Sequence, residues 1–343
     1  MITISLCMIV KNEEKVLRRC LDSVADLVEE LVIVDTGSTD ATKQIAAGYA
    51  NAKVYDFEWV DDFSAARNFA FSKATQEYIY SADADEVLDE ENRERFRLLK
   101  EALLPQVEIV QMKYANQLQY GTVYNFDEEY RPKLFRRLRT FTWMEPIHET
   151  INVTPVIYDS DIVITHMPET LHADRDFKAF RRMLERGVRL SKRLQNMYAK
   201  ELFINGEMKD FLQAEDFFEQ SARDTERDAE EVKEACLVTA AAARRRGDEE
   251  KFFKYAMKVM ADGGNAEVCR ELGDFYREKQ DYEEAAIWYY NACYETEAEL
   301  AVKVKGRETL ERLADCYDQM GLQTEAERYR KAVSYTHLRA HET

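Results

Sequence analysis

Residues 30–42 read ELVIVDTGSTDAT, an apolar run that ends at an acidic residue and continues into a polar turn. The run has the length and composition of a buried strand. Three further apolar runs alternate with amphipathic stretches in the first part of the chain, at 4–10 (ISLCMIV), 52–57 (AKVYDF) and 77–83 (EYIYSAD). Alternation of this kind predicts βαβ units and a mainly parallel, Rossmann-like sheet.

Polar residues follow three of these runs, as KNEE at 11–14, DTGSTD at 35–40 and DADE at 83–86. In parallel sheets, ligands bind at the carboxyl ends of the strands, so the three polar segments are expected to form one site. Asp83 and Asp85 would repel a diphosphate unless a divalent cation bridged them, and Mg²⁺ or Mn²⁺ prefers such oxygen ligands. Taken alone, this motif is more often an acidic loop than a metal site.

The pattern changes twice after this region. Residues 107–165 are rich in short, irregular β-type runs, which predict an antiparallel extension that closes the site and contacts an acceptor. From residue 173 the pattern is helical, so we expect an α/β domain at 1–172 and an all-α domain at 173–332. Four helix-turn-helix units in the second domain can be aligned on their turns, at 205–206, 246–247, 279–280 and 320–321.

The third unit, residues 272–293, resembles a tetratricopeptide repeat. Gly273 and Ala285 lie at the small-residue positions of that repeat, and Tyr276 and Tyr282 at its aromatic positions. The fourth unit resembles the repeat too, whereas the first two are looser. An ordinary all-α bundle is the alternative.

The last eleven residues, VSYTHLRAHET at 333–343, do not continue the helical pattern. They correspond to one reading frame of a transposon-end sequencing adapter, so we expect this tail to be foreign to the protein and exclude its histidines as candidate ligands. On this interpretation the natural chain continues past residue 332, and the all-α domain is truncated.

The composition of the chain argues against several classes of protein. The chain has 343 residues and a net charge of −18, so it would repel polyanions, and nucleic-acid binding is not expected. The six cysteines contain no CxxC pair, which argues against a zinc site or a disulfide framework and favours a cytoplasmic protein. The first residues lack the features of a secretory signal, and no apolar stretch is long enough to suggest a membrane span.

Four motifs occur in a fixed order: MIVKNEE (8–14), VIVDTGSTDAT (32–42), DFSAARNFA (62–70) and YSADADE (80–86). Together they resemble the GT-A fold of the family 2 glycosyltransferases, and especially the branch that includes the sublancin-type S-glycosyltransferases. The resemblance covers residues 2–170. It implies an α/β GT-A domain, a nucleotide-sugar donor and a divalent cation, Mn²⁺ or Mg²⁺.

The resemblance also assigns roles in the donor site. It places Asp35 at the nucleotide base, in a pocket lined by Lys11, Asn12 and Glu13. It places Arg67 and Asn68 at the nucleotide or its diphosphate. Asp83 would contact ribose or the metal, and Asp85 would bind the metal. Plainer alternatives exist, because Asp35 could belong to a simple polar turn and Arg67 could be a solvated charge on a helix.

A second group of candidates lies in WMEPIHET, residues 143–150. In the resembling enzymes a His-Glu pair near the acceptor follows a basic aromatic stretch. Inverting transfer needs a base that takes the acceptor proton, and Glu149 is the first candidate, followed by His148 and Glu145. A purely structural carboxylate is the alternative.

The resemblance places His166 at the fold's C-terminal histidine, which completes the shell of the metal or the diphosphate. A core or surface histidine is the alternative. A basic cluster in this acidic chain would suit a diphosphate or an acidic acceptor, although such clusters are more often solvated faces. Its members are Arg131, Lys133, Arg136, Arg137 and Arg139.

These observations predict an inverting, metal-dependent glycosyltransferase that moves a sugar from a nucleoside diphosphate donor, expected to be UDP-linked, to an acceptor such as a peptide or protein. The repeats would bind an acceptor peptide, a protein partner or a second subunit. Two alternatives stay open. A nucleotidyltransferase of similar fold would release pyrophosphate, and a repeat scaffold with an inactive transferase domain would release nothing.

Overall fold

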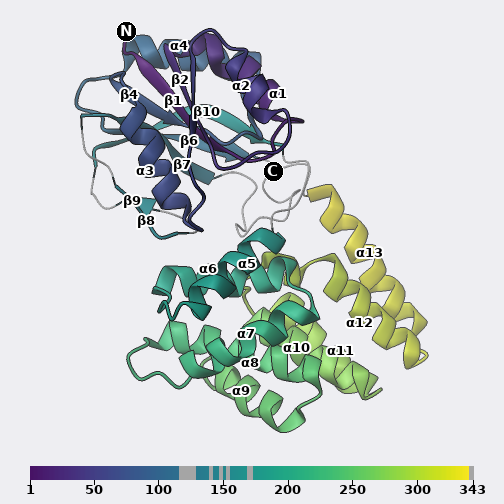
Figure 1. The fold of residues 1–343 in the computed structure, drawn as a ribbon. Coiled ribbons are helices and arrows are strands. Elements are labelled where there is room, and N and C mark those ends of the chain that lie inside the picture. Colours follow the sequence, from purple (N-terminus) through teal and green to yellow (C-terminus); the bar gives the residue numbers. More distant parts are fainter. Residues whose placement is uncertain (116–128, 139–141, 147–149, 152–154, 168–172, 340–343) are drawn as a thin grey trace. The chain divides into compact units, whose positions relative to one another are not determined.

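The computed structural model describes residues 1–115, 129–138, 142–146, 150–151, 155–167 and 173–339, without the side chains of 173–174 and 334–339. The chain divides into two units, Met1–His172 and Ala173–Thr343 (Figure 1). The first unit contains the sheet, and the second is helical. The predicted fold class, an α/β GT-A-like domain followed by an all-α region, is confirmed.

The sheet of the first unit has eight strands in the order β3-β2-β1-β4-β7-β6-β10-β5. Strands β1 to β4 pair in parallel, whereas β7 runs antiparallel to both β4 and β6. A separate antiparallel pair, β8 and β9, completes the strands. Their bounds are β1 Ile4–Val10, β2 Glu30–Asp35, β3 Ala52–Asp56, β4 Tyr78–Ser81, β5 Glu86–Val87, β6 Ile109–Ala115, β7 Glu129–Arg136, β8 Trp143–Met144, β9 Thr150–Ile151 and β10 Ile157–His166.

Helices cover both faces of the central strands, which explains why those strands are almost continuously apolar. Leu6 and Met8 of β1 pack in one core cluster with residues of α1, α2 and α4, whereas Cys7 points to the other face and packs with Ala70 of α3. Figure 1 shows α3 on the face opposite to α1 and α2. The helices are α1 Leu17–Val24, followed by the short η1 Ala25–Leu27, α2 Thr42–Ala47, α3 Phe63–Lys73 and α4 Glu90–Ala102.

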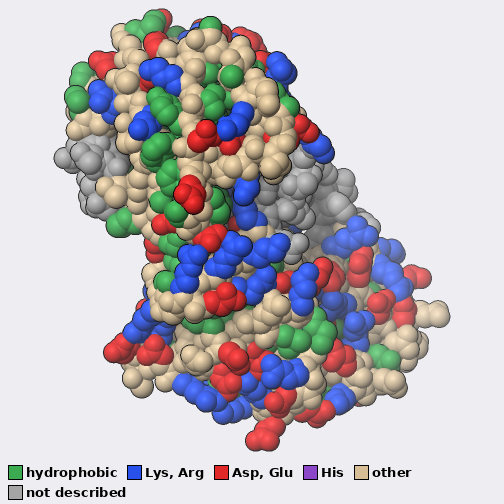
Figure 2. All heavy atoms as spheres, in the orientation of Figure 1, with side chains coloured by type: hydrophobic (Ala, Val, Ile, Leu, Met, Phe, Trp, Pro, Cys, Tyr) green, Lys and Arg blue, Asp and Glu red, His purple; other side chains and the backbone are tan. Residues whose placement is uncertain are grey.

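The second unit consists of successive helices, and each of the four turns expected from the sequence separates two of them. Figure 2 shows Lys and Arg side chains interspersed with Asp and Glu over its surface. None of the helices in the described residues is both long and apolar enough to cross a membrane. The helices are α5 Ala173–Glu185, α6 Lys192–Asn205, α7 Met208–Ser221, α8 Ala229–Arg246, α9 Glu249–Ala261, α10 Ala266–Glu278, α11 Tyr282–Tyr290, η3 Asn291–Glu295, η4 Val302–Lys305, α12 Arg307–Gln319 and α13 Gln323–Arg339.

Helix α13 extends into the tail that was expected to break the helical pattern. It runs to Arg339, and Val333 is buried in a cluster with Tyr329 and Leu313. An apolar residue that follows Tyr329 by four positions lies on the same face of the helix, so the core contact extends to the first tail residue. The adapter origin of residues 333–343 stays a prediction.

Helices α10 and α11 pack closely because Gly273 has no side chain. A Cβ atom at that position would lie 2.6 Å from the nearest ring atom of Tyr289. The Tyr289 ring is fully buried, and its hydroxyl donates a hydrogen bond to Oδ1 of Asp274 at 2.6 Å. The ring therefore has little freedom to move away from a methyl group.

We expect Gly273→Ala to lower the melting temperature. In the middle of a helix, Gly→Ala otherwise stabilises by about 1 kcal/mol, whereas overpacking a filled core costs about 1–3 kcal/mol. The sign of the change therefore separates the two effects, and calorimetry of the full chain measures it. A higher melting temperature would show that the contact with Tyr289 does not constrain this position.

Candidate functional site

Asp35 lies at the carboxyl end of β2 and is buried. Its Oδ1 accepts hydrogen bonds from the backbone N–H groups of Gly37 and Ser38, each at 2.9 Å. Its Oδ2 is buried and has no hydrogen-bond partner among the residues that the structure describes. One carboxylate oxygen thus forms the turn, and the other has no donor among the described residues, which calls for an explanation in a buried carboxylate.

The loop after β1 is tied to the loop after β2. Oδ1 of Asn12 accepts from the backbone N–H of Thr39 at 2.8 Å, and the backbone N–H of Asn12 donates to Oγ of Ser38 at 2.9 Å. Asn12 itself has a left-handed backbone, with φ of 57°, a conformation that asparagine tolerates better than most residues. Lys11 is exposed and Glu13 is half-buried in the same loop, and their roles in donor binding stay predictions.

Arg67 projects from α3 toward the end of β4. Its Nη1 donates to Oγ of Ser81 at 2.9 Å, and its Nη2 lies 3.4 Å from Oδ1 of Asp83. The guanidinium also lies over the ring of Trp143, with Cζ 5.1 Å from the ring centroid. Only 15% of the side chain is exposed, so Arg67 is not a solvated surface charge.

Asn68, the next residue, holds the β8–β9 pair against α3. Its Nδ2 donates to the backbone carbonyl of Trp143 at 3.0 Å, and its Oδ1 accepts from the N–H of the same residue at 2.9 Å. The backbone N–H of Phe63 donates to the carbonyl of Pro146 at 2.9 Å. Both ends of the Asn68 amide are therefore used by the protein, and its contact with the donor stays a prediction.

Asp85 and His166 come together at the end of β10. Oδ2 of Asp85 lies 3.1 Å from Nε2 of His166, and the two side chains are 14% and 13% exposed. The His166 ring also lies against Tyr114, at 5.3 Å between centroids. The two candidate metal ligands, which are distant in the sequence, are thus neighbours.

The third candidate ligand, Asp83, faces Arg67 instead. In the part of the chain that the structure describes, no group of three or more His, Cys, Asp or Glu side chains is arranged to hold a metal ion. A pair of ligands such as Asp85 and His166 fits a cation that takes its remaining ligands from substrate phosphates and water, as Mg²⁺ usually does.

Positive charges surround the acidic motif. Desolvation would raise the pKa of Asp83, but the charges of Arg67 and Lys133 hold that pKa well below its ordinary value. Glu86 forms an ion pair with Lys133 in which both side chains are buried. Burial raises the pKa of Glu86 to about 7, against the opposing charge of Lys133.

Of the basic cluster, Lys133 is buried, Arg131 and Arg136 are half-buried and Arg137 is exposed, whereas Arg139 lies outside the described residues. Lys133 points into the unit, and the Arg131 guanidinium lies over the Tyr114 ring, with Cζ 3.9 Å from its centroid. Arg136 and Arg137 donate to backbone carbonyls of Pro105 and Gln76. The signal for the burial of Lys133 lies in its neighbours, because it precedes the apolar pair Leu134–Phe135 in β7 and all three residues are buried.

The candidate bases His148 and Glu149 lie outside the described residues. The third candidate, Glu145, follows β8 and has a left-handed backbone with φ of 67°. Met144, the residue before it, pairs with Thr150 across the β8–β9 ladder.

We expect Lys133→Met to lower the free energy of unfolding by about 3–5 kcal/mol at about pH 8, since it leaves a buried carboxylate unpaired. Glu86 has a folded-state pKa above its unfolded value, so its contribution to stability is greatest at low pH and is lost as the pH rises toward 7. The loss should therefore be smaller at about pH 5, where the carboxyl group is neutral.

Urea denaturation of Lys133→Met and of Lys133→Met/Glu86→Gln measures both effects. The double variant should regain much of the lost stability, because it removes both buried charges. Equal losses in the two variants at both pH values would contradict the pairing of Lys133 with Glu86.

The chain is similar over part of its length to several curated proteins. It is 38% identical over 154 residues to a TPR repeat-containing protein of Synechococcus elongatus, covering 44% of this chain and 36% of that protein. It is 39% identical over 92 residues to the glycosyltransferase SunS of Bacillus subtilis, covering 26% and 22%. A third relative, the lipopolysaccharide core biosynthesis glycosyltransferase LpsC of Rhizobium meliloti, is 29% identical over 202 residues, covering 52% and 73%.

Two solved structures superpose loosely. Glucosyl-3-phosphoglycerate synthase of Mycobacterium tuberculosis, in complex with Mn²⁺, UDP and phosphoglyceric acid, gives a TM-score of 0.40 at 18% identity, covering 55% of this chain and 80% of that one. TarS of S. aureus gives a TM-score of 0.40 at 15% identity, covering 74% and 54%. Superpositions this loose transfer no residue role to this chain.

The family comparison is more specific. The model for "Glycosyl transferase family 2" matches residues 5–162, which span the sheet, the loops at its carboxyl edge and most of β10. The first two relatives are matched over about a third of their length or less, so their whole-protein activities do not carry over. Within these bounds, residues 5–162 of the N-terminal unit match the glycosyltransferase family 2 domain.

Proposed function

We propose that this domain transfers a sugar from a UDP-linked donor to an acceptor, with inversion at the anomeric carbon. The observation that carries the proposal is the meeting of three strand ends at one edge of the sheet. That edge holds Oδ2 of Asp35, which has no hydrogen-bond partner in the described part of the chain, together with the Arg67–Asp83 pair and the Asp85–His166 pair. An acceptor oxygen suits the base of a nucleotide, a guanidinium suits a diphosphate, and a carboxylate with an imidazole suits a cation.

Each part of the donor has a matching group in this proposal. Oδ2 of Asp35 accepts a hydrogen bond from an N–H group of the base, and Lys11, Asn12 and Glu13 line the same pocket. The Arg67 guanidinium binds the diphosphate, because it is charged at every relevant pH and has several donors. Its partner Asp83 then receives a ribose hydroxyl.

Asp85 and His166 would hold a divalent cation, Mn²⁺ or Mg²⁺. Such an ion stabilises the negative charge that develops on a departing diphosphate. His166 must be neutral to serve as a ligand, and Asp85 must be ionised. Both side chains are mostly buried, so the protein fixes their orientation before the donor arrives.

The base that removes the acceptor proton is assigned to Glu149, with His148 as the next candidate. In the sequence, both lie between β8 and β9, and Asn68 and Phe63 of α3 hold the backbone at Trp143 and Pro146. The same helix carries Arg67, the residue proposed to bind the diphosphate.

The helical unit is proposed to bind the acceptor, as a peptide or protein, or to bind a protein partner or a second copy of the chain. Helical hairpins in series present extended surfaces to other polypeptides. The transfer chemistry itself requires only residues of the first unit.

The direct test is a hydrolysis and transfer assay with a panel of nucleotide sugars, with and without Mn²⁺. We expect UDP release from one UDP-sugar and little turnover without the cation. Release of pyrophosphate instead would favour a nucleotidyltransferase, and an absence of turnover with every donor and cation would favour an inactive scaffold.

Replacement of Asp85 by Asn should lower transfer by about 100-fold or more, since it removes the charge of a proposed ligand whose ion contributes several kcal/mol. Asp83→Asn should be milder if Asp83 serves ribose. Asp161→Asn, an exposed position on the same strand as His166, is the matched control and should keep wild-type turnover. Rates measured across a Mn²⁺ titration compare the three variants, and wild-type metal dependence in Asp85→Asn would remove the cation from the proposal.

A further inference from the structure

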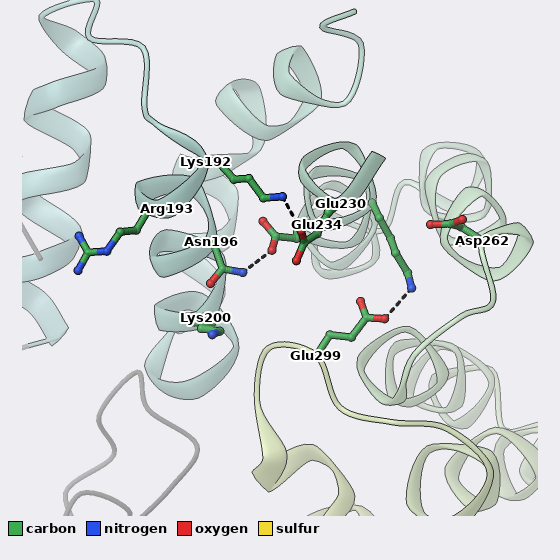
Figure 3. A pocket seen from close by; sticks show the side chains of 9 residues that line it. Lys192, Arg193, Asn196, Lys200, Glu230, Glu234, Asp262 and Glu299 are labelled. Carbon is green, nitrogen blue, oxygen red and sulfur yellow. Dashed lines mark hydrogen bonds and ion pairs between the residues drawn. The ribbon is translucent and has the colours of Figure 1, made fainter. Parts of the chain in front are cut away.

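The helical unit contains a groove of about 830 Å³ between α6 and α8 (Figure 3). Two of its lysines pair with acidic neighbours, since Lys192 lies 2.5 Å from Glu230 and Lys233 lies 2.6 Å from Glu299. Exposed pairs of this kind contribute little energy, and they do not indicate one class of ligand. The contacts around Tyr114 in the N-terminal unit are more informative, because they bear directly on the candidate cation site.

Tyr114 lies near the carboxyl end of β6 and is 2% exposed. Its strand neighbours are Ile164 of β10 on one side and Glu129 of β7 on the other. Tyr114 therefore belongs to the strand between the one that ends in His166 and the one that carries Arg131.

The Tyr114 ring contacts side chains of both neighbouring strands. Its centroid lies 5.3 Å from that of the His166 ring, and the two ring planes are 35° apart. On the other strand, Cζ of Arg131 lies 3.9 Å from the Tyr114 centroid, and Nζ of Lys133 lies 5.1 Å from it. Contacts of these kinds are directional, so the ring restricts the orientation of the side chains packed against it.

The hydrogen bond between Asp85 and His166 orients the imidazole only while no cation is bound. Oδ2 of Asp85 lies 3.1 Å from Nε2 of His166, and with an ionised Asp85 this contact needs a proton on Nε2. To act as a metal ligand, Nε2 must give up that proton and offer its lone pair, so the hydrogen bond is lost. The packing against Tyr114 is a contact between two rings and uses no lone pair, so it does not depend on the state of Nε2.

We infer that Tyr114 is a positioning residue of the cation site, and that its ring keeps Nε2 of His166 directed at Asp85. The inference rests on the proposed function, in which Asp85 and His166 hold the cation. The backbone of His166 is fixed separately, by its pairing with Glu86 across the β10–β5 ladder. That ladder does not restrict the broad rotation of the imidazole about its last side-chain bond, whereas a neighbouring ring does.

The test is a Mn²⁺ titration of the full chain in the presence of UDP, followed by the electron paramagnetic resonance signal of free Mn²⁺. Tyr114→Phe keeps the ring and should bind Mn²⁺ within about twofold of the unaltered chain. Tyr114→Leu removes the ring and should weaken Mn²⁺ binding about tenfold or more, the effect usual for a group that orients a metal ligand. Tyr114→Met gives the same comparison if Tyr114→Leu does not fold.

Two further variants separate the orientation of His166 from a general loss of packing. Tyr78→Leu removes another buried tyrosine, at the amino end of β4, where its hydroxyl donates to the carbonyl of Val107. This control should leave Mn²⁺ binding unchanged. In a His166→Ala background, Tyr114→Leu should cause no further loss of Mn²⁺ binding, because the ring then has no imidazole to orient.

Mn²⁺ binding by Tyr114→Leu that equals that of the unaltered chain would overturn the inference. A loss of the same size in the His166→Ala background would overturn it as well. An unaltered chain that binds UDP but no Mn²⁺ would remove the cation from the proposed function, and the inference with it. The two kinds of failure are distinguishable, because the first appears only in the variants and the second appears in the unaltered chain.

Discussion

The parallel pairing of β1 with both β2 and β4 is the constraint on which the rest of the N-terminal unit depends. It sets Val10 opposite Asp35 and Cys7 opposite Ser81, so the loops that follow the three strands leave the sheet at one edge. Burial of both faces fixes the register, because a slip of one residue would exchange the side chains of the two cores. Burial of the apolar strand residues fixes where each strand ends, and the polar residues of the following loops therefore meet at this edge.

A chain with a net charge of −18 can bind an anionic donor only where the local balance is different. At the carboxyl edge, Arg67 and Lys133 offset the acidic motif, and they lower the pKa of Asp83 enough to keep it ionised. Two other buried carboxylates have different partners. Glu86 forms an ion pair with Lys133 of the same unit, whereas Glu234 accepts a hydrogen bond from the Asn196 amide.

Local patterns in the sequence predicted the strands, the helices and the edge at which the candidate residues lie, because period and strand-end chemistry are local properties. Contacts between residues that are distant in the sequence were harder to predict. The Asp85–His166 pair spans 81 positions and was expected only through resemblance to a family, whereas the two hydrogen bonds of Asn68 to Trp143 and the Lys133–Glu86 pair had no such guide.

We propose that the carboxyl edge of this sheet binds a nucleoside diphosphate through Asp35 at one end and the Asp85–His166 pair at the other. A crystal structure of the full chain with UDP and Mn²⁺ tests this proposal most directly. We expect the base within hydrogen-bond distance of Oδ2 of Asp35, and the ion between Asp85, His166 and the diphosphate. A nucleotide bound elsewhere, or one whose base lies away from Asp35, would contradict it.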